Sequence, residues 1–293
     1  MRKAKRWLPG LLLVSPSLIA LGWFVYYFIG VNAQVSLSDW KGQAQTTGWA
    51  GFKWYQELFA DETFHNDIRN LLIFTLVFIG GSLLVGGVLA LLMDKGVRGE
   101  NVFRSIYLFP MAISFIATGI IWRWLLNSDT GAGTTGINDL LGLVGGHSEW
   151  HKSDSDWAVA SIALPAGWAL SGYVMALFLA GLRSIPDELR EAARVDGASE
   201  FRVYWHVVRP MMIPAIMSAL VILVHISMKT FDLIYAIAPL DPRTETPAVY
   251  MYLTSFRGGF YARGAAIATM LFLAITIVVA PYVWWATKKE RIR

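Results

Sequence analysis

Long apolar runs alternate with short polar and basic segments along this 293-residue chain. A helix needs about 20 consecutive, mostly apolar residues to cross the hydrocarbon core of a bilayer. Six stretches satisfy that requirement, at about residues 8–31, 68–93, 105–126, 157–182, 207–228 and 262–287. The pattern predicts an all-α integral membrane protein whose six transmembrane helices form one domain over residues 1–293.

Small residues recur at every fourth position in two of these stretches, which places them on one face of each helix. The second stretch carries Ser82, Gly86 and Ala90, and the fourth carries Gly172, Ala176 and Ala180. Such faces let helix backbones approach one another closely within a membrane. We expect both faces to be packing surfaces between helices.

Lysine and arginine side chains are distributed unevenly over the segments between the apolar stretches. Cytoplasmic loops of membrane proteins carry an excess of these residues. One side of the membrane would hold Arg2, Lys3, Lys5, Arg6, Lys95, Arg98, Arg104, Arg183, Arg190, Arg194, Arg202, Arg209, Lys288, Lys289, Arg291 and Arg293. The other side would hold the smaller set Lys41, Lys53, Arg69, Lys152, Arg243, Arg257 and Arg263. Both termini and the segment 184–210 are therefore predicted to be cytoplasmic. The net charge of +4 follows from this asymmetry and requires no nucleic-acid partner.

The basic start and the apolar run that follows it also resemble a cleaved signal peptide. The apolar run is too long for that, and Val31-Asn32-Ala33 is a weak cleavage site. We expect an uncleaved first transmembrane helix. The chain has no cysteine, which excludes a disulfide framework.

The polar segment between the fourth and fifth apolar stretches has the pattern of a helix, a turn and a second helix. Pro186 suits the first helical position, with Ser184 as a cap before it. Gly197 stands where a helix would end in a left-handed residue. Ser199 suits the cap of a second, short helix, which we expect to end before Pro210.

This segment resembles the EAA loop of binding-protein-dependent ABC importer permeases, in particular those for maltose-like sugars and glycerol phosphate. The family pattern is Glu-Ala-Ala, three residues, Gly, nine residues, Ile, one residue and Leu-Pro. The matching residues are Glu191-Ala192-Ala193, Gly197, Val207 and Arg209-Pro210, and Asp196-Gly197-Ala198 is the family's usual Asp-Gly-Ala. Arg209 in place of Leu is a departure from the pattern. The resemblance covers nearly the whole chain from about Gly51, with its sharpest motifs at residues 98–124, 180–210 and 231–266.

The resemblance implies the fold of a type I ABC importer permease in the plasma (inner) membrane of a bacterium or archaeon. It implies that an ATPase is coupled through Glu191, Ala192, Ala193, Asp196, Gly197 and Ala198. The implied partners are a second homologous permease, two ABC ATPase subunits and an extracytoplasmic sugar-binding protein, besides membrane lipid. The ATPases would bind ATP and Mg and would hydrolyse the ATP. This chain would be a transport subunit without a cofactor or metal, because it has no GxxxxGK[ST] loop to hold phosphate.

A sugar presents hydroxyl groups around apolar C–H faces, so its site needs polar groups beside an aromatic surface. On a continuous fifth helix, Leu223, Ser227, Thr230 and Ile234 would share one face. The resemblance places Tyr173, Ser227 and Thr230 at positions that contact sugar in maltose-type permeases. The alternative for Ser227 and Thr230 is that each hydroxyl bonds back to its own helix.

Three charged residues lie close to the expected membrane interfaces. Lys229 and Asp232 are three residues apart, so on a helix they would pair, and we interpret them as a structural ion pair. Arg123 lies near the outer end of the third stretch. It suits either a structural role at headgroup level or a gating or substrate role.

Two other classes of membrane protein stand as alternatives. An ion-coupled secondary transporter would favour buried acids or interrupted helices in matching halves of the chain, and the sequence shows neither clearly. A membrane enzyme would need a catalytic constellation, and no HExxH or GxSxG motif occurs. The resemblance to the sugar permeases thus remains the basis of the expected function, a permease that moves a monosaccharide, oligosaccharide or glycoside by alternating access.

Overall fold

The computed structural model describes residues 4–42, 48–129 and 136–290, and these residues are predominantly helical. Their β-type pairing is confined to one isolated bridge between Ser38 and Trp49. The prediction of an all-α chain is therefore confirmed. The described residues fall into two compact units, the first within Met1–Phe64 and Tyr250–Ala274 and the second within His65–Val249 and Ile275–Arg293. A single permease domain over residues 1–293 stays a prediction.

Six apolar helical segments correspond to the six predicted transmembrane helices. Five are long enough to cross a membrane on their own, Leu12–Ser36, Glu62–Asp94, Trp157–Arg183, Glu200–Met228 and Tyr261–Pro281. The sixth is a bent pair, Glu100–Ala112 and Phe115–Leu125, whose halves meet at 97°. Five or six candidate spans are thus present, depending on whether the bent pair counts as one span.

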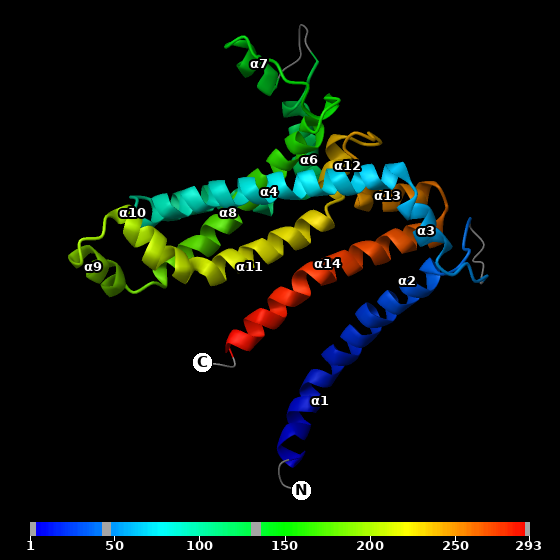
Figure 1. The fold of residues 1–293 in the computed structure, drawn as a ribbon, viewed down its shortest axis with the longest axis horizontal. Coiled ribbons are helices and arrows are strands. Elements are labelled where there is room, and N and C mark those ends of the chain that lie inside the picture. Colours follow the sequence, from blue (N-terminus) through cyan, green and yellow to red (C-terminus); the bar gives the residue numbers. More distant parts are fainter. Residues whose placement is uncertain (1–3, 43–47, 130–135, 291–293) are drawn as a thin grey trace. The chain divides into compact units, whose positions relative to one another are not determined.

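In the first unit, α1 (Ala4–Leu21) leads through the wider helical turn Gly22–Tyr27 into α2 (Phe28–Ser36). The next helix is α3 (Lys53–Phe59). A hydrogen bond from the Trp54 indole N–H to the Ser38 carbonyl oxygen, at 2.7 Å, attaches α3 to the segment after α2. The Asn32 side-chain amide donates to the Ala265 carbonyl oxygen at 3.2 Å and to the Thr269 hydroxyl at 3.0 Å. These bonds attach α2 to the first part of α14 (Tyr261–Glu290), seen in Figure 1.

A carboxylate connects three segments of the first unit. Asp61 pairs with Arg263 and accepts a hydrogen bond from the Tyr250 hydroxyl at 2.6 Å. Burial alone would raise the pKa of Asp61, but the hydrogen bonds from Tyr250 and Thr63 and the charge of Arg263 outweigh it and hold the pKa below its ordinary value. Asp61 is therefore ionised in the folded protein at neutral pH.

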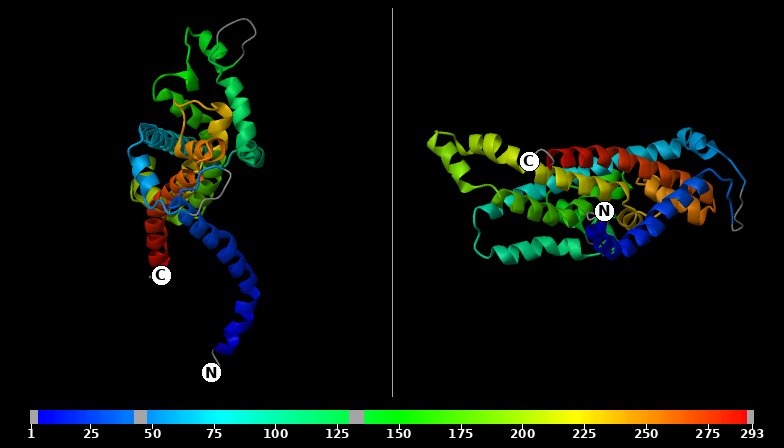
Figure 2. Two further views of the ribbon diagram at one scale, coloured as in Figure 1. Left: turned by 90° about the vertical axis from the view of Figure 1, so that its right-hand side faces the viewer. Right: turned by 90° about the horizontal axis from the view of Figure 1, so that it is seen from below.

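The second unit is built around α8 (Trp157–Arg183), which is buried along most of its length. The helices α4 (Glu62–Asp94) and α11 (Arg209–Met228) run beside it, as Figures 1 and 2 show. The shorter α5 (Glu100–Leu108) and α6 (Phe115–Leu125) also pack against α8, and α12 (Asp232–Ile237) packs against α6. The remaining short helices are α7 (Ile137–Gly142), α9 (Asp187–Val195), α10 (Glu200–Val203) and α13 (Pro247–Tyr252).

The small residues of α4 form its contact with α8, as predicted. Ser82 and Ala90 are fully buried, and a Cβ atom added to Gly86 would lie 2.6 Å from the Ser171 carbonyl oxygen. The backbone of α8 is even closer to α5 at Gly172, where an added Cβ would overlap the Tyr107 carbonyl oxygen. Glycine at both positions permits a helix spacing that any side chain would prevent.

The third predicted helix, 105–126, is broken rather than continuous. The chain leaves the helical conformation at Ile113, whose backbone is extended, and Ser114 caps the next helix by accepting from the Ala117 N–H at 3.2 Å. Pro110 sits in the short helical turn before the break. The apolar pattern predicts where the chain crosses a membrane, but it carries no signal for the direction that the chain takes after a cap.

The fifth helix ends at Met228 as its apolar stretch predicts, but its start differs from the prediction. The short helix after Ser199 does not end before Pro210, because the wider helical turn Tyr204–Val208 joins α10 to α11 and the helix runs on through Pro210. The wider turn precedes Pro210 directly, and such a turn accommodates a ring that would clash with the preceding turn of a regular α-helix. At the other end α11 stops at Met228. The residues Leu223, Ser227, Thr230 and Ile234 therefore do not share one helical face.

Replacing Gly86 by alanine is expected to lower the stability of the protein. The new methyl group would force the α8 backbone at Ser171 to move, and overpacking of this kind costs about 1–3 kcal/mol. Gly81 on the same helix has no atom within 4 Å of an added Cβ, so Gly81→Ala should leave stability unchanged or raise it. Thermal unfolding in detergent measures both variants, and equal midpoints would contradict this packing.

Replacing Asp61 by asparagine is expected to destabilise the first unit in a pH-dependent way. Hydrogen bonds to a charged group contribute about 1.5–3 kcal/mol, and asparagine loses the charge. Because the folded pKa is lowered, this contribution is present above the unfolded pKa and is lost as the pH falls through the folded value. Wild type should thus unfold at a higher temperature than Asp61→Asn at pH 7, and the difference should shrink below about pH 4. Glu57→Gln, in an exposed pair with Lys53, is the control and should show little difference at any pH.

Candidate functional site

The segment that resembles the EAA loop forms α9 and α10 at one end of the second unit (Figure 1). It follows α8 directly and leads into α11, so it connects the two helices that pack closely within this unit. The charged residues at the ends of α9 interact favourably with its helix dipole. Asp187 and Glu188 lie in the first turn, near the positive end, and Arg194 lies in the last turn, near the negative end.

Gly197 ends α9 in the predicted left-handed conformation, with φ of +78°. The Ala198 N–H donates to the Ala193 carbonyl oxygen and the Gly197 N–H to the Arg194 carbonyl oxygen, each at 3.0 Å. This pair of bonds is the Schellman motif, which satisfies the carbonyl groups at a helix end. In the family pattern, Glu-Ala-Ala thus lies within a helix and the Gly forms the C-terminal cap of that helix.

The predicted start of α9 is wrong by one position. Pro186 is the cap residue and Asp187 the first helical residue, whereas the Ser184 hydroxyl donates to the Gly181 carbonyl oxygen of α8. Ser199 does occupy the cap position of α10, but its side chain makes no capping hydrogen bond. Sequence preferences therefore place the helix boundaries well and the individual capping bonds poorly.

The predicted coupling residues form an exposed surface. Glu191, Ala192, Asp196 and Gly197 are exposed, while Ala193 and Ala198 are half-buried. Beside them Val195 is 88% exposed. A helix face of alanine, valine and a carboxylate offers apolar area together with one acceptor of hydrogen bonds. Such a face suits contact with another protein.

The opposite side of the segment is anchored to the rest of the unit. Ile185, Val203 and Val208 are buried. The Arg190 guanidinium pairs with Asp94, the last residue of α4, at 3.0 Å. Across the Gly197 turn, Arg194 pairs with Glu200 at 2.7 Å. The segment is thus exposed on one face and attached on the other.

The hydroxyls of Ser227 and Thr230 both bond back to α11. Ser227 donates to the Val224 carbonyl oxygen at 2.9 Å, and Thr230 donates to the Ile226 carbonyl oxygen at 2.7 Å. Ser227 also accepts from the Thr75 hydroxyl of α4 at 3.1 Å. Both side chains are buried. The hydroxyls retain lone pairs for a further acceptor role, but their protons are committed to the helix.

Tyr173 lies at a cavity of about 390 Å³ between α8 and α11. That cavity is lined by Met111, Ile113, Phe115, Leu170, Tyr173, Ile222 and Ile226. Its lining is thus mostly apolar, and it includes Ile226, the residue before Ser227.

The charged residues that the sequence singled out do not pair as predicted. No ion pair joins Lys229 and Asp232 in the described structure, where both side chains are exposed. The reason is that α11 ends before Lys229, so helical spacing does not apply. Arg123 is also exposed and lines a cavity of about 350 Å³ with Trp124, Asp129, His151 and others. His151 is 7% exposed, and burial together with the charges of Lys152 and Arg123 lowers its pKa.

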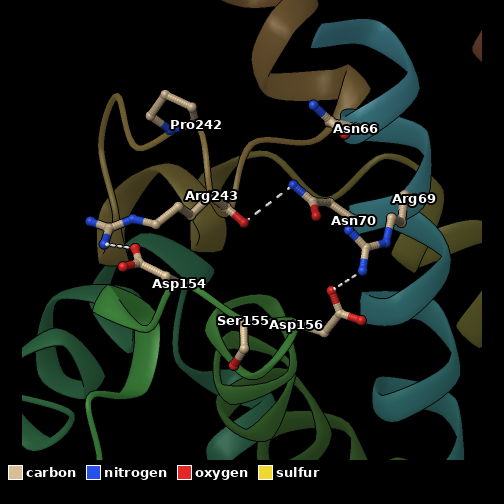
Figure 3. A pocket seen from close by; sticks show the side chains of 8 residues that line it. All are labelled: Asn66, Arg69, Asn70, Asp154, Ser155, Asp156, Pro242 and Arg243. Carbon is tan, nitrogen blue, oxygen red and sulfur yellow. Dashed lines mark hydrogen bonds and ion pairs between the residues drawn. The ribbon is translucent and has the colours of Figure 1, made fainter. Parts of the chain in front are cut away.

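A polar cavity of about 250 Å³ lies near the N-terminal end of α4, at the end of that helix remote from α9 (Figure 3). Arg69 of α4 pairs with Asp156, which precedes α8. The Asn70 amide donates to the Arg243 and Glu245 carbonyl oxygens at 3.3 and 2.8 Å. Arg243 in turn pairs with Asp154 at 3.1 Å.

Sequence reasoning did not identify this polar cavity. Its residues come from the start of α4, the segment before α8 and the loop after α12. Each of these segments looks like an ordinary polar end of a span. Polar residues next to the ends of three apolar stretches are a weak signal, because only the tertiary structure shows that the three ends meet.

Known proteins with a similar sequence cover almost the whole chain. The family of binding-protein-dependent transport system inner membrane components matches residues 82–287. A probable ABC transporter permease protein of Pyrococcus horikoshii is 39% identical over 96% of this chain and 96% of its own length. The xylose/arabinose import permease protein XacH of Haloferax volcanii is 33% identical over 90% of this chain and 84% of its own length.

A solved structure shows the same fold. It is a bacterial alginate ABC transporter in complex with an alginate pentasaccharide-bound periplasmic protein. One of its chains has a TM-score of 0.77 and is 22% identical, with 95% of this chain and 94% of that chain covered.

These findings confirm the resemblance that the EAA-like segment indicated. They give no support to the alternative of an ion-coupled secondary transporter. The chain therefore belongs to the family of binding-protein-dependent transport system inner membrane components, and it is the membrane-spanning permease subunit of an ABC importer.

Proposed function

We propose that this permease carries a sugar, either a monosaccharide, an oligosaccharide or a glycoside. The observation that carries the proposal is the named activity of the Haloferax volcanii relative, a xylose/arabinose import permease that aligns with nine-tenths of this chain. The family is defined by dependence on a binding protein. An extracytoplasmic sugar-binding protein would deliver the substrate, and a second, homologous permease would complete the path through the membrane.

The exposed face of α9 is the proposed docking surface for an ATPase subunit. Glu191, Ala192, Ala193, Asp196, Gly197 and Ala198 would form the contact. Two ATPase subunits would serve the pair of permeases, and they would bind ATP and Mg. The support for this assignment is geometric: the face is exposed and partly apolar, and its other side is anchored to the helices that cross the membrane.

We infer the direction of insertion from the excess of lysine and arginine that cytoplasmic loops carry. By this rule α9 and both termini would lie in the cytoplasm. Closure of the ATPases would move α9, and α8 and α11 would tilt with it because packed helices move as units. The path would then open alternately to the two sides of the membrane.

Tyr173, Ser227 and Thr230 are the proposed sugar contacts. Tyr173 already lies at a cavity and offers a ring with a hydroxyl, which suits the amphipathic face of a sugar. Ser227 and Thr230 would act as acceptors, since both donate their protons to backbone carbonyls.

The first test of the docking surface is co-purification of tagged permease from its native membrane. Wild type should bring down a P-loop ATPase and a second permease. Glu191→Ala with Gly197→Asp should lose the ATPase by about tenfold or more, because the variant removes an acceptor and adds a side chain and charge at a left-handed turn. Gly145→Asp is the matched control, since Gly145 has a φ of +73° in a different loop and open space around it. Equal ATPase recovery from all three proteins would refute the assignment of the docking surface.

The sugar contacts are tested by uptake into membrane vesicles. The substrate would be the labelled sugar that wild type takes up best from a panel of pentoses, hexoses and disaccharides. Tyr173→Phe, Ser227→Ala and Thr230→Val should each raise KM by about two- to tenfold, because one hydrogen bond contributes about 0.5–1.5 kcal/mol. Ser218→Ala serves as the control, since the Ser218 hydroxyl bonds back to Pro214 in the same helix. An unchanged KM in all four variants would mean that the three hydroxyls have only structural roles.

A further inference from the structure

Both ends of the connection between α4 and α5 carry a carboxylate that is paired with an arginine from the region of the α8 C-terminus. Asp94 is the last residue of α4, and it pairs with Arg190 of α9 at 3.0 Å. Glu100 is the first residue of α5, and it pairs with Arg183, the last residue of α8, at 2.7 Å. The first pair attaches the connecting loop to α9, and the second attaches it to the end of α8.

The position of Asp94 makes the first pair more than an incidental surface contact. A carboxylate at the C-terminal end of a helix is unfavourable, because that end of the dipole is itself negative. The Arg190 guanidinium offsets this repulsion. Each of the two side chains is only 17% exposed, so the pair is screened by salt far less than an exposed pair.

Arg190 holds a second group at the same time. Its guanidinium donates to the Leu182 carbonyl oxygen at 2.8 Å, and this carbonyl belongs to the last turn of α8. One side chain on α9 therefore joins the ends of α4 and α8. A guanidinium can do this because its donors form a rigid, planar fork, whereas a lysine ammonium is a single point charge on a flexible stem.

Glu100 forms the corresponding junction at the start of α5. One carboxylate oxygen accepts from Arg104 of the same helix, and the other accepts from Arg183 of α8. A carboxylate in the first turn also favours the helix dipole. The start of α5 is therefore fixed both within its own helix and to α8.

These contacts restrict how α9 can move. A displacement of α9 must either carry Asp94 with it or separate two partly buried charges, and leaving one such charge without its partner is costly. A cavity of about 440 Å³ lies between the end of α4 and the segment α9–α10. The two sides of this space are joined through the Asp94–Arg190 pair, so motion on one side reaches the other through that pair.

We propose that the Asp94–Arg190 pair transmits the movement of α9 to α4, and that the Glu100–Arg183 pair passes the accompanying movement of the α8 end to α5. The inference rests on the proposed docking of an ATPase at α9 and extends it. Closure of the ATPases would be delivered to four helices, α8 and α11 through the chain itself and α4 and α5 through the ion pairs. Asp94 and Arg190 are thus positioning residues for the transport cycle.

The test uses the complete importer with its binding protein in proteoliposomes, where sugar uptake and ATP hydrolysis are measured together. Asp94→Arg and Arg190→Asp should each lower the sugar taken up per ATP hydrolysed by at least about fivefold, the low end of typical coupling between sites. The double variant with both changes reverses the pair and should recover most of the ratio. Arg98→Glu, a charge reversal at an exposed residue of the same loop, should leave the ratio unchanged.

The outcomes separate this proposal from the one on which it rests. If the wild-type permease recruits no ATPase, the docking surface and this transmission route both fail. If wild type is coupled and the single variants keep the wild-type ratio, the transmission route alone is refuted. The transmission route is also refuted if the double variant takes up no more sugar per ATP hydrolysed than the worse of the two single variants. A purely structural pair would lower yield or thermal stability and would leave the ratio as it is.

Discussion

No water is available in the hydrocarbon core of a bilayer, so every backbone N–H and C=O group there must find a partner within the protein. Helices meet this requirement along their length, but each helix end leaves four groups without an intrahelical partner. The ends and breaks are therefore the positions where individual side chains matter most. Ser114 caps the helix that resumes after the break in the third span. Gly197 closes α9 with a Schellman motif, and Arg190 satisfies a carbonyl in the last turn of α8.

The groups that satisfy helix ends also connect the helices to one another. Near the start of α4, the Asn70 amide donates to two carbonyl groups of the loop after α12. At the end of the same helix, Asp94 pairs with Arg190 of α9. Between these two ends α4 packs on α8 through Ser82 and Gly86. The helix is thus fastened at both ends and packed closely in the middle, and it can move only together with its neighbours.

The coupling segment combines two properties that a transmitting element needs. It has an exposed face, and its other face is attached to the ends of α4 and α8. A segment with only the exposed face could bind an ATPase but would not transmit its movement to the other helices. A segment with only the attached face would have no surface at which an ATPase could bind. The Glu-Ala-Ala and Gly pattern provides the first property, while Arg190, which lies just before that pattern, provides the second.

The sequence by itself determined the helical class, the approximate spans and the position of the EAA-like segment. Apolar length, small-residue spacing and the left-handed glycine are local properties, and each can be detected along the chain. The Gly197 cap and the Ser82–Gly86 contact follow from such signals. The family resemblance was also carried by residues that are near one another in sequence.

Only the tertiary structure decided which distant groups meet. The bend after Ala112 and the cavity that Tyr173 shares with Ile222 and Ile226 depend on how helices pack, and no periodic pattern records that. The same holds for Asp94 and Arg190, which are 96 residues apart and look like ordinary charges of two basic loops. A side chain that caps a distant helix leaves no local signal, because its partner is a backbone carbonyl that every residue possesses.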